Sequence, residues 1–280
     1  MNALFALLQR LLPQHLLSRL TGRAANARAR WIRKPFVHGF ARIYGVDLSE
    51  AEHPRLDDYD SFNAFFTRAL APGARPLDPD PAALLSPADG MVSQAGRLDH
   101  DRLMQAKGTS YRLADLIGAG GGAADGGEEF HGGSFATIYL APRDYHRVHL
   151  PAAGTLTATT AIPGALFSVN ARTEAAVANL FCRNERLVCR FETGHGAMLV
   201  VLVGALIVAS IETVWGGTPS PYRHLEHQRW QRPFGRGAEI GRFLLGSTVI
   251  VCCEPGRLEL DGSVRPGTRV KMGQRLGRLR

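Results

Sequence analysis

The sequence predicts an α+β protein in which a β-rich domain, mostly antiparallel and barrel- or sandwich-like, follows an N-terminal amphipathic helical region. Three observations support this. From Leu84 onward, short apolar runs alternate with turn residues, which is the rhythm of β-structure. In the first 50 residues apolar side chains recur at three- and four-residue steps, which indicates amphipathic helices. The length of 280 residues, 45% of them hydrophobic, suits one large domain or one domain with an appendage.

Residues 1–50 form the predicted helical arm, and the excess positive charge lies within it. Residues 1–46 hold eight Lys and Arg and no Asp or Glu, whereas the other 25 basic residues balance the 25 acidic ones. Basic, leucine-rich amphipathic helices suit an anionic membrane surface. A helical hairpin packed on the core is one alternative. A nucleic-acid-binding arm is a weaker one, because such arms rarely contain so much leucine, so no nucleic-acid partner is predicted.

No segment reaches the roughly 18–20 apolar residues that are needed to span a bilayer. The longest apolar run, from Met198 to Ile211, has 14 residues and includes Gly204 and Ser210. Its β-branched residues suit a buried strand. The sequence therefore predicts a protein that lies on a membrane rather than one that crosses it.

The other elements are predicted in order along the chain. A connector over residues 51–80 contains a helical face with Phe62, Phe65 and Phe66, and a group of prolines ends that helix. A further helix is expected over residues 174–180. The basic and aromatic segment 216–237 is interpreted either as an irregular surface loop or as a contact for lipid headgroups. Strands are expected over residues 135–140, 147–150, 155–162, 186–191, 198–212, 247–253 and 258–260.

Neither a disulfide nor a metal site is predicted. The four cysteines form no CxxC pair and are interpreted as reduced thiols in a cytosolic setting. The pairs His146/His149 and His224/His227 have HxxH spacing rather than the HExxH spacing of zinc hydrolases, and no third ligand is evident.

The Gly246–Ser247 bond, within Leu245-Gly-Ser-Thr248, is the feature of the chain most suggestive of chemistry. Glycine does not shield its carbonyl and tolerates a distorted backbone. The Ser247 hydroxyl can attack that carbonyl if a base removes its proton. Ester formation, β-elimination and hydrolysis would then leave a pyruvoyl group in place of Ser247. A Gly-Ser pair is common in loops, so this interpretation depends on the other motifs.

Two upstream motifs supply the partners that such a serine needs. Asp89 lies in the turn Ser86-Pro-Ala-Asp-Gly90, and Asp144-Tyr-His-Arg-Val-His149 carries two histidines. Asp89, a histidine and Ser247 could form a triad, for which chain order does not matter. A hydrolase that keeps Ser247 as a stable nucleophile is the second hypothesis, although the G-x-S-x-G elbow is absent. A non-enzymatic membrane-binding module is the third.

The motifs together resemble the pyruvoyl-dependent phosphatidylserine decarboxylases of the bacterial, membrane-associated type. Several separate motifs in the same order are far more specific than any one of them. The resemblance rests on Ser61-Phe-Asn-Ala-Phe-Phe-Thr-Arg68, Ser86-Pro-Ala-Asp-Gly90, Gln105-Ala-Lys-Gly108, Asp144-Tyr-His-Arg-Val-His149, Phe167-Ser-Val-Asn170, Asn184-Glu-Arg186, Val203-Gly-Ala205, Ile211-Glu-Thr-Val-Trp215 and Gly241-Arg-Phe-Leu-Leu-Gly-Ser-Thr248.

The resemblance implies that Asp89, His149 and Ser247 form the self-cleavage triad, with His146 assisting decarboxylation. The catalytic domain would comprise residues 51–280, after the helical arm. The zymogen would split after Gly246 into a β chain, residues 1–246, and an α chain, residues 247–280. These chains would stay associated as a heterodimer, with possible further dimerisation.

The resemblance also implies the reaction and its place in the cell. The covalent pyruvoyl group from Ser247, the only cofactor, would form a Schiff base with the serine amine of phosphatidylserine. Loss of carbon dioxide would then give phosphatidylethanolamine, a step of phospholipid biosynthesis. The enzyme would sit peripherally on the cytoplasmic face of the cell membrane.

Overall fold

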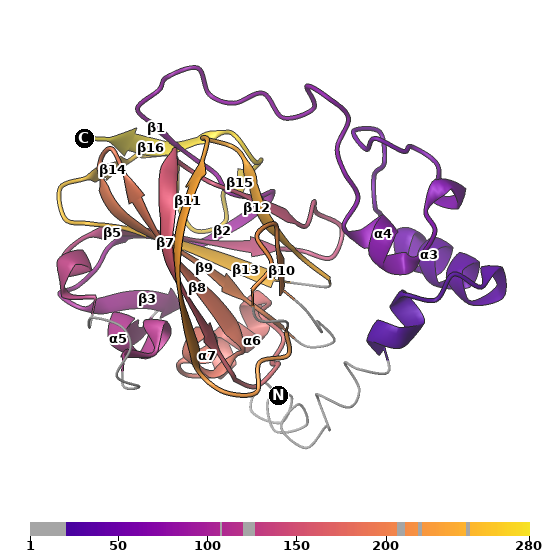
Figure 1. The fold of residues 1–280 in the computed structure, drawn as a ribbon, viewed down its shortest axis with the longest axis horizontal. Coiled ribbons are helices and arrows are strands. Elements are labelled where there is room, and N and C mark those ends of the chain that lie inside the picture. The colour runs from indigo at the N-terminus through magenta and orange to yellow at the C-terminus, as the bar shows by residue number, and fades with distance from the viewer. Residues whose placement is uncertain (1–20, 107, 120–126, 206–210, 218–219, 245–246) are drawn as a thin grey trace.

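The computed structural model describes residues 21–106, 108–119, 127–205, 211–217, 220–244 and 247–280. A small helical unit lies to one side of a larger β-rich body (Figure 1). The helices are α3 (Arg30–Tyr44), η1 (Leu56–Asp58), α4 (Phe62–Phe66), α5 (Leu113–Ile117), η3 (Glu128–Phe130), α6 (Ala171–Ala176) and α7 (Leu180–Arg183). The strands are β1 (Ala83–Leu85), β2 (Gly90–Arg97), β3 (Arg102–Ala106), β4 (Thr109–Arg112), β5 (Ser134–Leu140), β6 (Arg147–His149), β7 (Gly154–Ile162), β8 (Arg186–Thr193), β9 (Gly196–Val203), β10 (Ile211–Thr213), β11 (Glu226–Phe234), β12 (Glu239–Phe243), β13 (Ser247–Cys253), β14 (Leu258–Leu260), β15 (Arg269–Val270) and β16 (Arg275–Leu279).

An eight-stranded sheet in the order β11-β7-β8-β9-β13-β5-β2-β15 forms the centre of the β-rich body. Every pairing between its strands is antiparallel. Smaller sheets, β10-β12-β6, β1-β16-β14 and β3-β4, complete the body. None of these sheets closes on itself among the described strands, so the predicted α+β class is confirmed in its sandwich-like form.

Strand β13 shows how the central sheet is packed. Side chains alternate between the two faces of a strand. Val249 and Val251 belong to a hydrophobic cluster shared with β1, β6, β12 and β16, whereas Ile250 and Cys252 belong to a second cluster shared with β3, β4, α5 and α7. All seven residues of β13 are buried. The alternation puts Ser247 on the same face as Val249, toward the β10-β12-β6 sheet.

The helical unit has a hydrophobic cluster of its own. Aromatic side chains of α4, which carries the three predicted phenylalanines, pack against α3, with Phe36 stacked on Phe62 at 4.2 Å between ring centroids. The cluster also includes Leu48 and Ala51, so it continues across position 50. The leucine-rich part of the predicted arm, residues 1–20, lies outside the described residues. No helix within the described part of the chain has the length and apolarity to cross a bilayer.

Several predicted boundaries were wrong in detail. The helix expected over residues 174–180 is two short helices, because Asn179 adopts a left-handed conformation (φ 56°) between α6 and α7. The apolar run 198–212 was expected to be one strand, but β9 ends at Val203 and β10 begins at Ile211. The segment interpreted as a loop, 216–237, contains the nine-residue strand β11, which lies at one edge of the central sheet.

The Asn184-Glu-Arg186 motif ties several loops to the start of β8. Arg186 is buried, forms no ion pair with a carboxylate of the described residues, and donates to the carbonyl oxygens of Asp115, Leu116, Cys182 and Asn184 at 2.6–2.9 Å. In addition, the Asn184 amide donates to the carbonyl oxygens of Phe167 and Gly204, and the Glu185 carboxylate accepts from the backbone N–H of Tyr222. The motif therefore has a structural role at the end of the sheet where Ser247 lies.

We expect Arg186→Met to destabilise the fold strongly, because four carbonyl groups, two of them in buried hydrogen bonds, would lose a charged donor. A loss of about 3 kcal/mol of unfolding free energy is expected. Chemical denaturation followed by tryptophan fluorescence would measure it. The matched control is Arg229→Met, at an exposed arginine on β11, which should change the unfolding free energy by less than about 0.5 kcal/mol. Equal stability of the two variants would contradict this role.

Candidate functional site

Asp89 lies in the turn immediately before β2 and is held by a bidentate ion pair. The guanidinium of Arg75 donates to both carboxylate oxygens, at 2.9 Å from Nε and 2.5 Å from Nη2. The backbone N–H of Met272 donates to the same carboxylate at 2.8 Å. Two parallel N–H···O bonds fix both the position and the plane of a carboxylate. Asp89 is therefore a well-ordered anion on the face of a cavity.

His149 ends strand β6, and its two ring nitrogens have different partners. Nδ1 lies 2.8 Å from the carbonyl oxygen of Gly237. A carbonyl only accepts hydrogen bonds, so Nδ1 carries the proton and Nε2 is the basic nitrogen. The Tyr145 hydroxyl donates to Nε2 at 2.9 Å. Burial lowers the pKa of His149 below its usual 6.5, so the ring is neutral at neutral pH.

Ser247 is the first residue of β13 and is paired in register with Leu140 of β5. The serine is fully buried, and its Oγ has no hydrogen-bond partner among the described residues. Buried hydroxyls in folded proteins normally have one. Gly246, the other half of the predicted cleavage site, lies outside the described residues. The Ser247 hydroxyl is thus not engaged by a described residue, as is also true of the adjacent Thr248 hydroxyl.

His146 occupies a different environment from His149. Its ring is stacked on Phe66 at 4.0 Å between centroids, and Nε2 lies 3.1 Å from the carbonyl oxygen of Ala141. Nδ1 has no partner among the described residues. Complete burial, with the charge of Arg68 nearby, lowers the pKa of His146 to about 3. The ring is therefore neutral, and Nδ1 is an acceptor without a donor.

The structure brings these segments close together without closing a hydrogen-bonded triad. The Asp89 carboxylate faces Arg75, the Nδ1 proton of His149 is donated to a carbonyl, and Ser247 Oγ bonds to neither residue. The backbone N–H of His149 donates to the carbonyl oxygen of Pro87, two residues before Asp89. His146 bonds to Ala141, the residue after the register partner of Ser247. Of the two histidines, His146 therefore has its hydrogen-bond partner closer in sequence to Leu140, the β5 residue that pairs with Ser247.

Three partners of the site were not predicted from the sequence. Arg75 lies in a proline-rich connector with no local pattern that ties it to Asp89. The Gly237 carbonyl has no side-chain signature at all. Tyr145, by contrast, belongs to the same motif as both histidines, and its position beside His146 could have drawn attention to it. Burial raises the pKa of the Tyr145 phenol, so this hydroxyl stays protonated as a donor.

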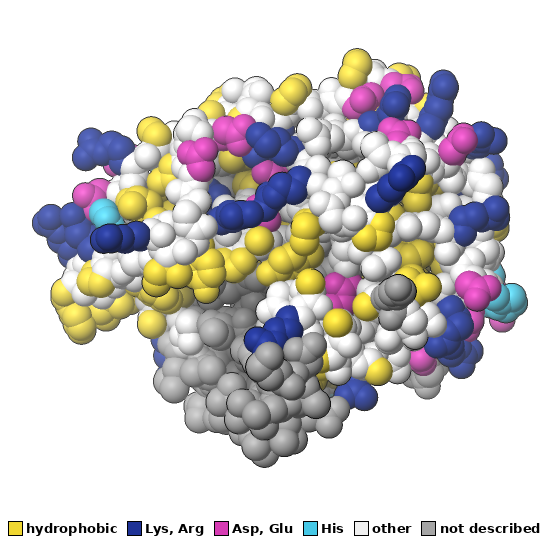
Figure 2. Space-filling model, turned by 180° about the vertical axis from the view of Figure 1, so that it is seen from behind, with side chains coloured by type: hydrophobic (Ala, Val, Ile, Leu, Met, Phe, Trp, Pro, Cys, Tyr) yellow, Lys and Arg dark blue, Asp and Glu magenta, His cyan; other side chains and the backbone are white. Residues whose placement is uncertain are grey.

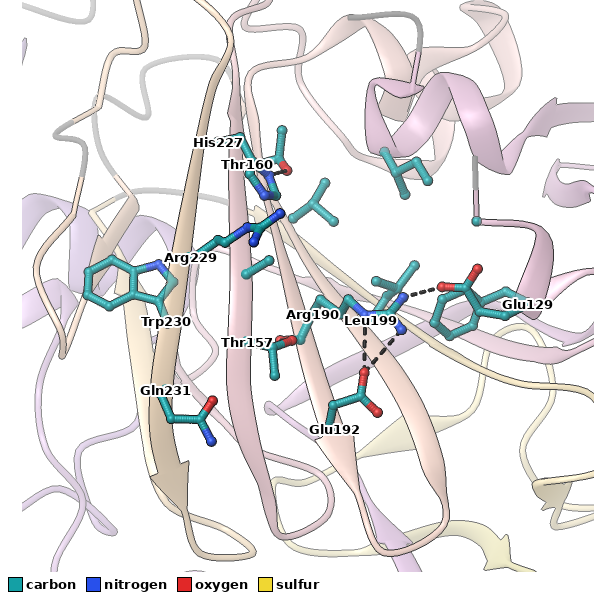
Figure 3. Close-up of a pocket in the computed structure, with 15 residues that line it drawn as sticks. Glu129, Thr157, Thr160, Arg190, Glu192, Leu199, His227, Arg229, Trp230 and Gln231 are labelled. Atoms are coloured by element: carbon teal, nitrogen blue, oxygen red, sulfur yellow. Dashed lines mark hydrogen bonds and ion pairs between the residues drawn. The ribbon is translucent and has the colours of Figure 1, made fainter. Parts of the chain in front are cut away.

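A cavity of about 680 Å³ lies elsewhere, over β11, β7 and β8. Figure 3 shows that its central cation, Arg190, is held between Glu129 and Glu192. The cavity contains none of the predicted site residues. Because Arg190 is already paired with two carboxylates, this cavity offers less chemistry than the surroundings of Asp89.

The four cysteines are buried or partly buried. All four are free, and burial raises the pKa of Cys182 to about 12, so the thiols are not activated. Within the described residues no group of three or more His, Cys, Asp or Glu side chains is placed to hold a metal ion.

Comparison with known proteins is consistent with these features. A family model described as phosphatidylserine decarboxylase matches residues 62–278, and one described as PSD matches residues 4–45. Phosphatidylserine decarboxylase proenzymes of Pseudomonas fluorescens and Pseudomonas entomophila are each 52% identical over 98% of this chain, covering 96% and 97% of their own lengths. The proenzyme of Methylococcus capsulatus is 51% identical over 99% of this chain and 97% of its own. The chain belongs to the phosphatidylserine decarboxylase family.

We expect both histidines to remain neutral through the physiological range. Because the pKa of each is lowered, His149 should be half protonated only below pH 6.5, and His146 should stay neutral down to pH 5. Titration of ring signals by NMR measures this, with His146→Gln and His149→Gln variants to assign the signals. A midpoint at or above pH 6.5 for His149 would show that its ring is not shielded from solvent as described.

Proposed function

We propose that this chain is the proenzyme of a pyruvoyl-dependent decarboxylase that converts phosphatidylserine to phosphatidylethanolamine. The observation that carries the proposal is the buried, unpartnered hydroxyl of Ser247 at the first position of the central strand β13. Membership of the family, over nearly the whole chain, supports the same activity.

Self-cleavage begins with attack of Ser247 Oγ on the carbonyl carbon of Gly246. The C–N bond breaks as the acyl group moves to oxygen, so an ester replaces the amide. Loss of the Ser247 Cα proton then eliminates the Gly246 carboxylate and leaves a dehydroalanine at position 247. Its imine tautomer is hydrolysed by water, which releases ammonia and leaves the ketone. Once formed, the pyruvoyl group supplies an electron sink for the charge that departing carbon dioxide leaves behind.

In this proposal His149 is the base, acting through Nε2, and Asp89 stabilises the imidazolium by its charge. The Gly237 carbonyl keeps the proton on Nδ1, the position at which a triad carboxylate usually acts. Tyr145 occupies Nε2 before the reaction, so its hydroxyl either relays the Ser247 proton or moves aside. His146, which is buried and bonded to the residue after the Ser247 register partner, assists decarboxylation by holding or moving a proton at Nδ1.

The two products of cleavage stay associated in this proposal because the α chain is part of the sheet. Residues 247–280 contribute β13, which pairs with β9 on one side and β5 on the other. Of the other α-chain strands, β16 pairs with β1 and β15 pairs with β2. Separation of the chains would expose both hydrophobic clusters. The β and α chains, 1–246 and 247–280, therefore act as one heterodimer, which can itself pair with a second copy.

We propose a division into a helical membrane-binding arm, residues 1–50, and a catalytic domain, residues 51–280. Exposed apolar side chains support the arm: Trp31 is 79% and Ile43 is 77% exposed on α3. Figure 2 shows hydrophobic side chains in a band along the helical unit, with Lys and Arg beside it. Apolar residues beside basic ones suit an anionic lipid surface. The enzyme would lie peripherally on the cytoplasmic face of the cell membrane.

Denaturing mass spectrometry of the protein purified in detergent tests the proposed function. We expect two chains, split after Gly246, with the smaller one lighter by one ammonia than a serine-started 247–280 peptide. Ser247→Ala should give one intact chain without decarboxylase activity. An intact wild-type chain that never cleaves would reject the pyruvoyl mechanism and favour a serine hydrolase that retains the hydroxyl.

The two histidines can be separated by asking which step each supports. We expect His149→Gln to remain uncleaved, because Ser247 would lose its base. His146→Gln should cleave normally but decarboxylate at least 100-fold more slowly, within the range that positioned proton transfer contributes. Cleavage is measured by mass and decarboxylation by carbon dioxide release. Because His146 is the histidine bonded nearer to Ser247, the reverse result would exchange the two roles.

A further inference from the structure

A cavity of about 430 Å³ lies beside Asp89, between the helical unit and the start of β2. Its wall includes Asp89, Gly90 and Tyr145, the residue whose hydroxyl donates to His149. The Tyr145 side chain therefore connects the cavity to His149, the proposed base. Its remaining wall comes mainly from the 141–146 turn, the segment after α3 and the turn after β15.

Most of the charges around this cavity are paired. Its wall contains five cationic side chains and four carboxylates, a formal excess of one positive charge. Arg75 is shared by Asp89 and Glu50, and Lys271 bonds to Glu50 at 2.8 Å. Arg269 lies 3.5 Å from Asp144. The fourth carboxylate, Asp47, accepts hydrogen bonds from Ser49 within its own turn.

Two arginines on the wall form no ion pair with any described residue. Arg68 is only 5% exposed, and its Nη1 has no hydrogen-bond partner. Its Nη2 donates to the carbonyl oxygens of Arg143 and Asp144, at 3.0 and 3.3 Å, so the guanidinium is fixed against the 141–146 turn. Arg143 is exposed at the mouth of the cavity. A buried cation without a counter-ion is costly unless something supplies one.

We propose that this cavity binds a phosphodiester group through Arg68 and Arg143, and that the group is that of the phosphatidylserine headgroup. The proposal rests on the proposed function and adds a substrate-binding site to it. Arginine suits this task because its planar, multi-donor guanidinium matches phosphate oxygens. The bound phosphodiester would give Arg68 a direct ion-pair partner, in addition to the more distant charges of Asp89 and Asp144.

The phosphodiester is a better occupant than the headgroup carboxylate. Only interactions that are stronger in the transition state than in the ground state accelerate a reaction. The carboxylate loses its charge as carbon dioxide leaves, so cations that held it would stabilise the substrate and slow the step. The phosphodiester keeps its charge throughout. Binding it improves affinity without opposing decarboxylation.

Arg143→Gln tests the site, because Arg143 is exposed and its removal should not disturb folding. We expect complete self-cleavage, an about tenfold higher KM for phosphatidylserine in mixed micelles, and a smaller effect on kcat. Arg143→Lys should fall between the variant and wild type. Arg229→Gln, an exposed arginine in the other cavity, is the matched control and should leave KM unchanged. An unchanged KM in Arg143→Gln would overturn the proposal.

Soluble probes identify what the cavity recognises. Glycerophosphoserine should inhibit Arg143→Gln about tenfold more weakly than wild type, whereas inhibition by serine methyl ester, which lacks phosphate, should be unchanged. Equal weakening for both probes would overturn the phosphodiester assignment. So would inhibition of wild type by inorganic phosphate as strong as that by glycerophosphoserine, because the site would then take free phosphate.

A membrane contact is the remaining explanation to separate. If Arg143→Gln also loses binding to phosphatidylglycerol vesicles, then Arg143 contacts the lipid surface and the headgroup site is rejected. The proposed function is judged independently, because wild type must contain the pyruvoyl group and release carbon dioxide. Active, cleaved variants with wild-type KM would reject only the cavity assignment.

Discussion

The packing of β13 is the constraint on which the rest of the structure depends. The strand is paired on both edges and covered on both faces, so its backbone has no freedom to adjust. Ser247 is its first residue and is paired with Leu140 of β5, so the packed strand fixes where Ser247 lies. Reaction geometry set by a packed strand is more exact than geometry set by a loop. The same packing would hold the α chain in place after cleavage.

The histidines are controlled by burial rather than by a carboxylate. Carbonyl oxygens of Gly237 and Ala141 fix which nitrogen of each ring carries the proton. Asp89 is engaged by Arg75, so its charge acts on His149 from a distance. A neutral imidazole with a known basic nitrogen is ready to take a proton without first losing one. In the proposed mechanism, this arrangement would replace the direct carboxylate–histidine bond of a triad with the carbonyl of Gly237 and the more distant charge of Asp89.

Much of the fold could be predicted because local sequence patterns determine it. The run of apolar residues in β13 and the three phenylalanines of α4 gave correct elements. Strand β11 was missed because it is an edge strand, with polar side chains on most of its length and no alternation to detect. The break at Asn179 depends on one left-handed residue. Within the site, the Arg75–Asp89 pair joins a connector to a turn, and only the tertiary fold brings them together.

Most of the charges around the candidate site residues are paired with one another. The nearest histidines are neutral, and Asp89 is matched by Arg75. Arg68 and Arg143, which form no ion pair with a described residue, line the cavity that also contains Asp89, and the charge of Arg68 reaches His146. Decarboxylation converts a carboxylate into a neutral molecule, so a cation at the carboxylate would oppose it. In the proposed binding mode, Arg68 and Arg143 would hold the phosphodiester, so their positive charge would attract an anionic lipid without contacting its carboxylate.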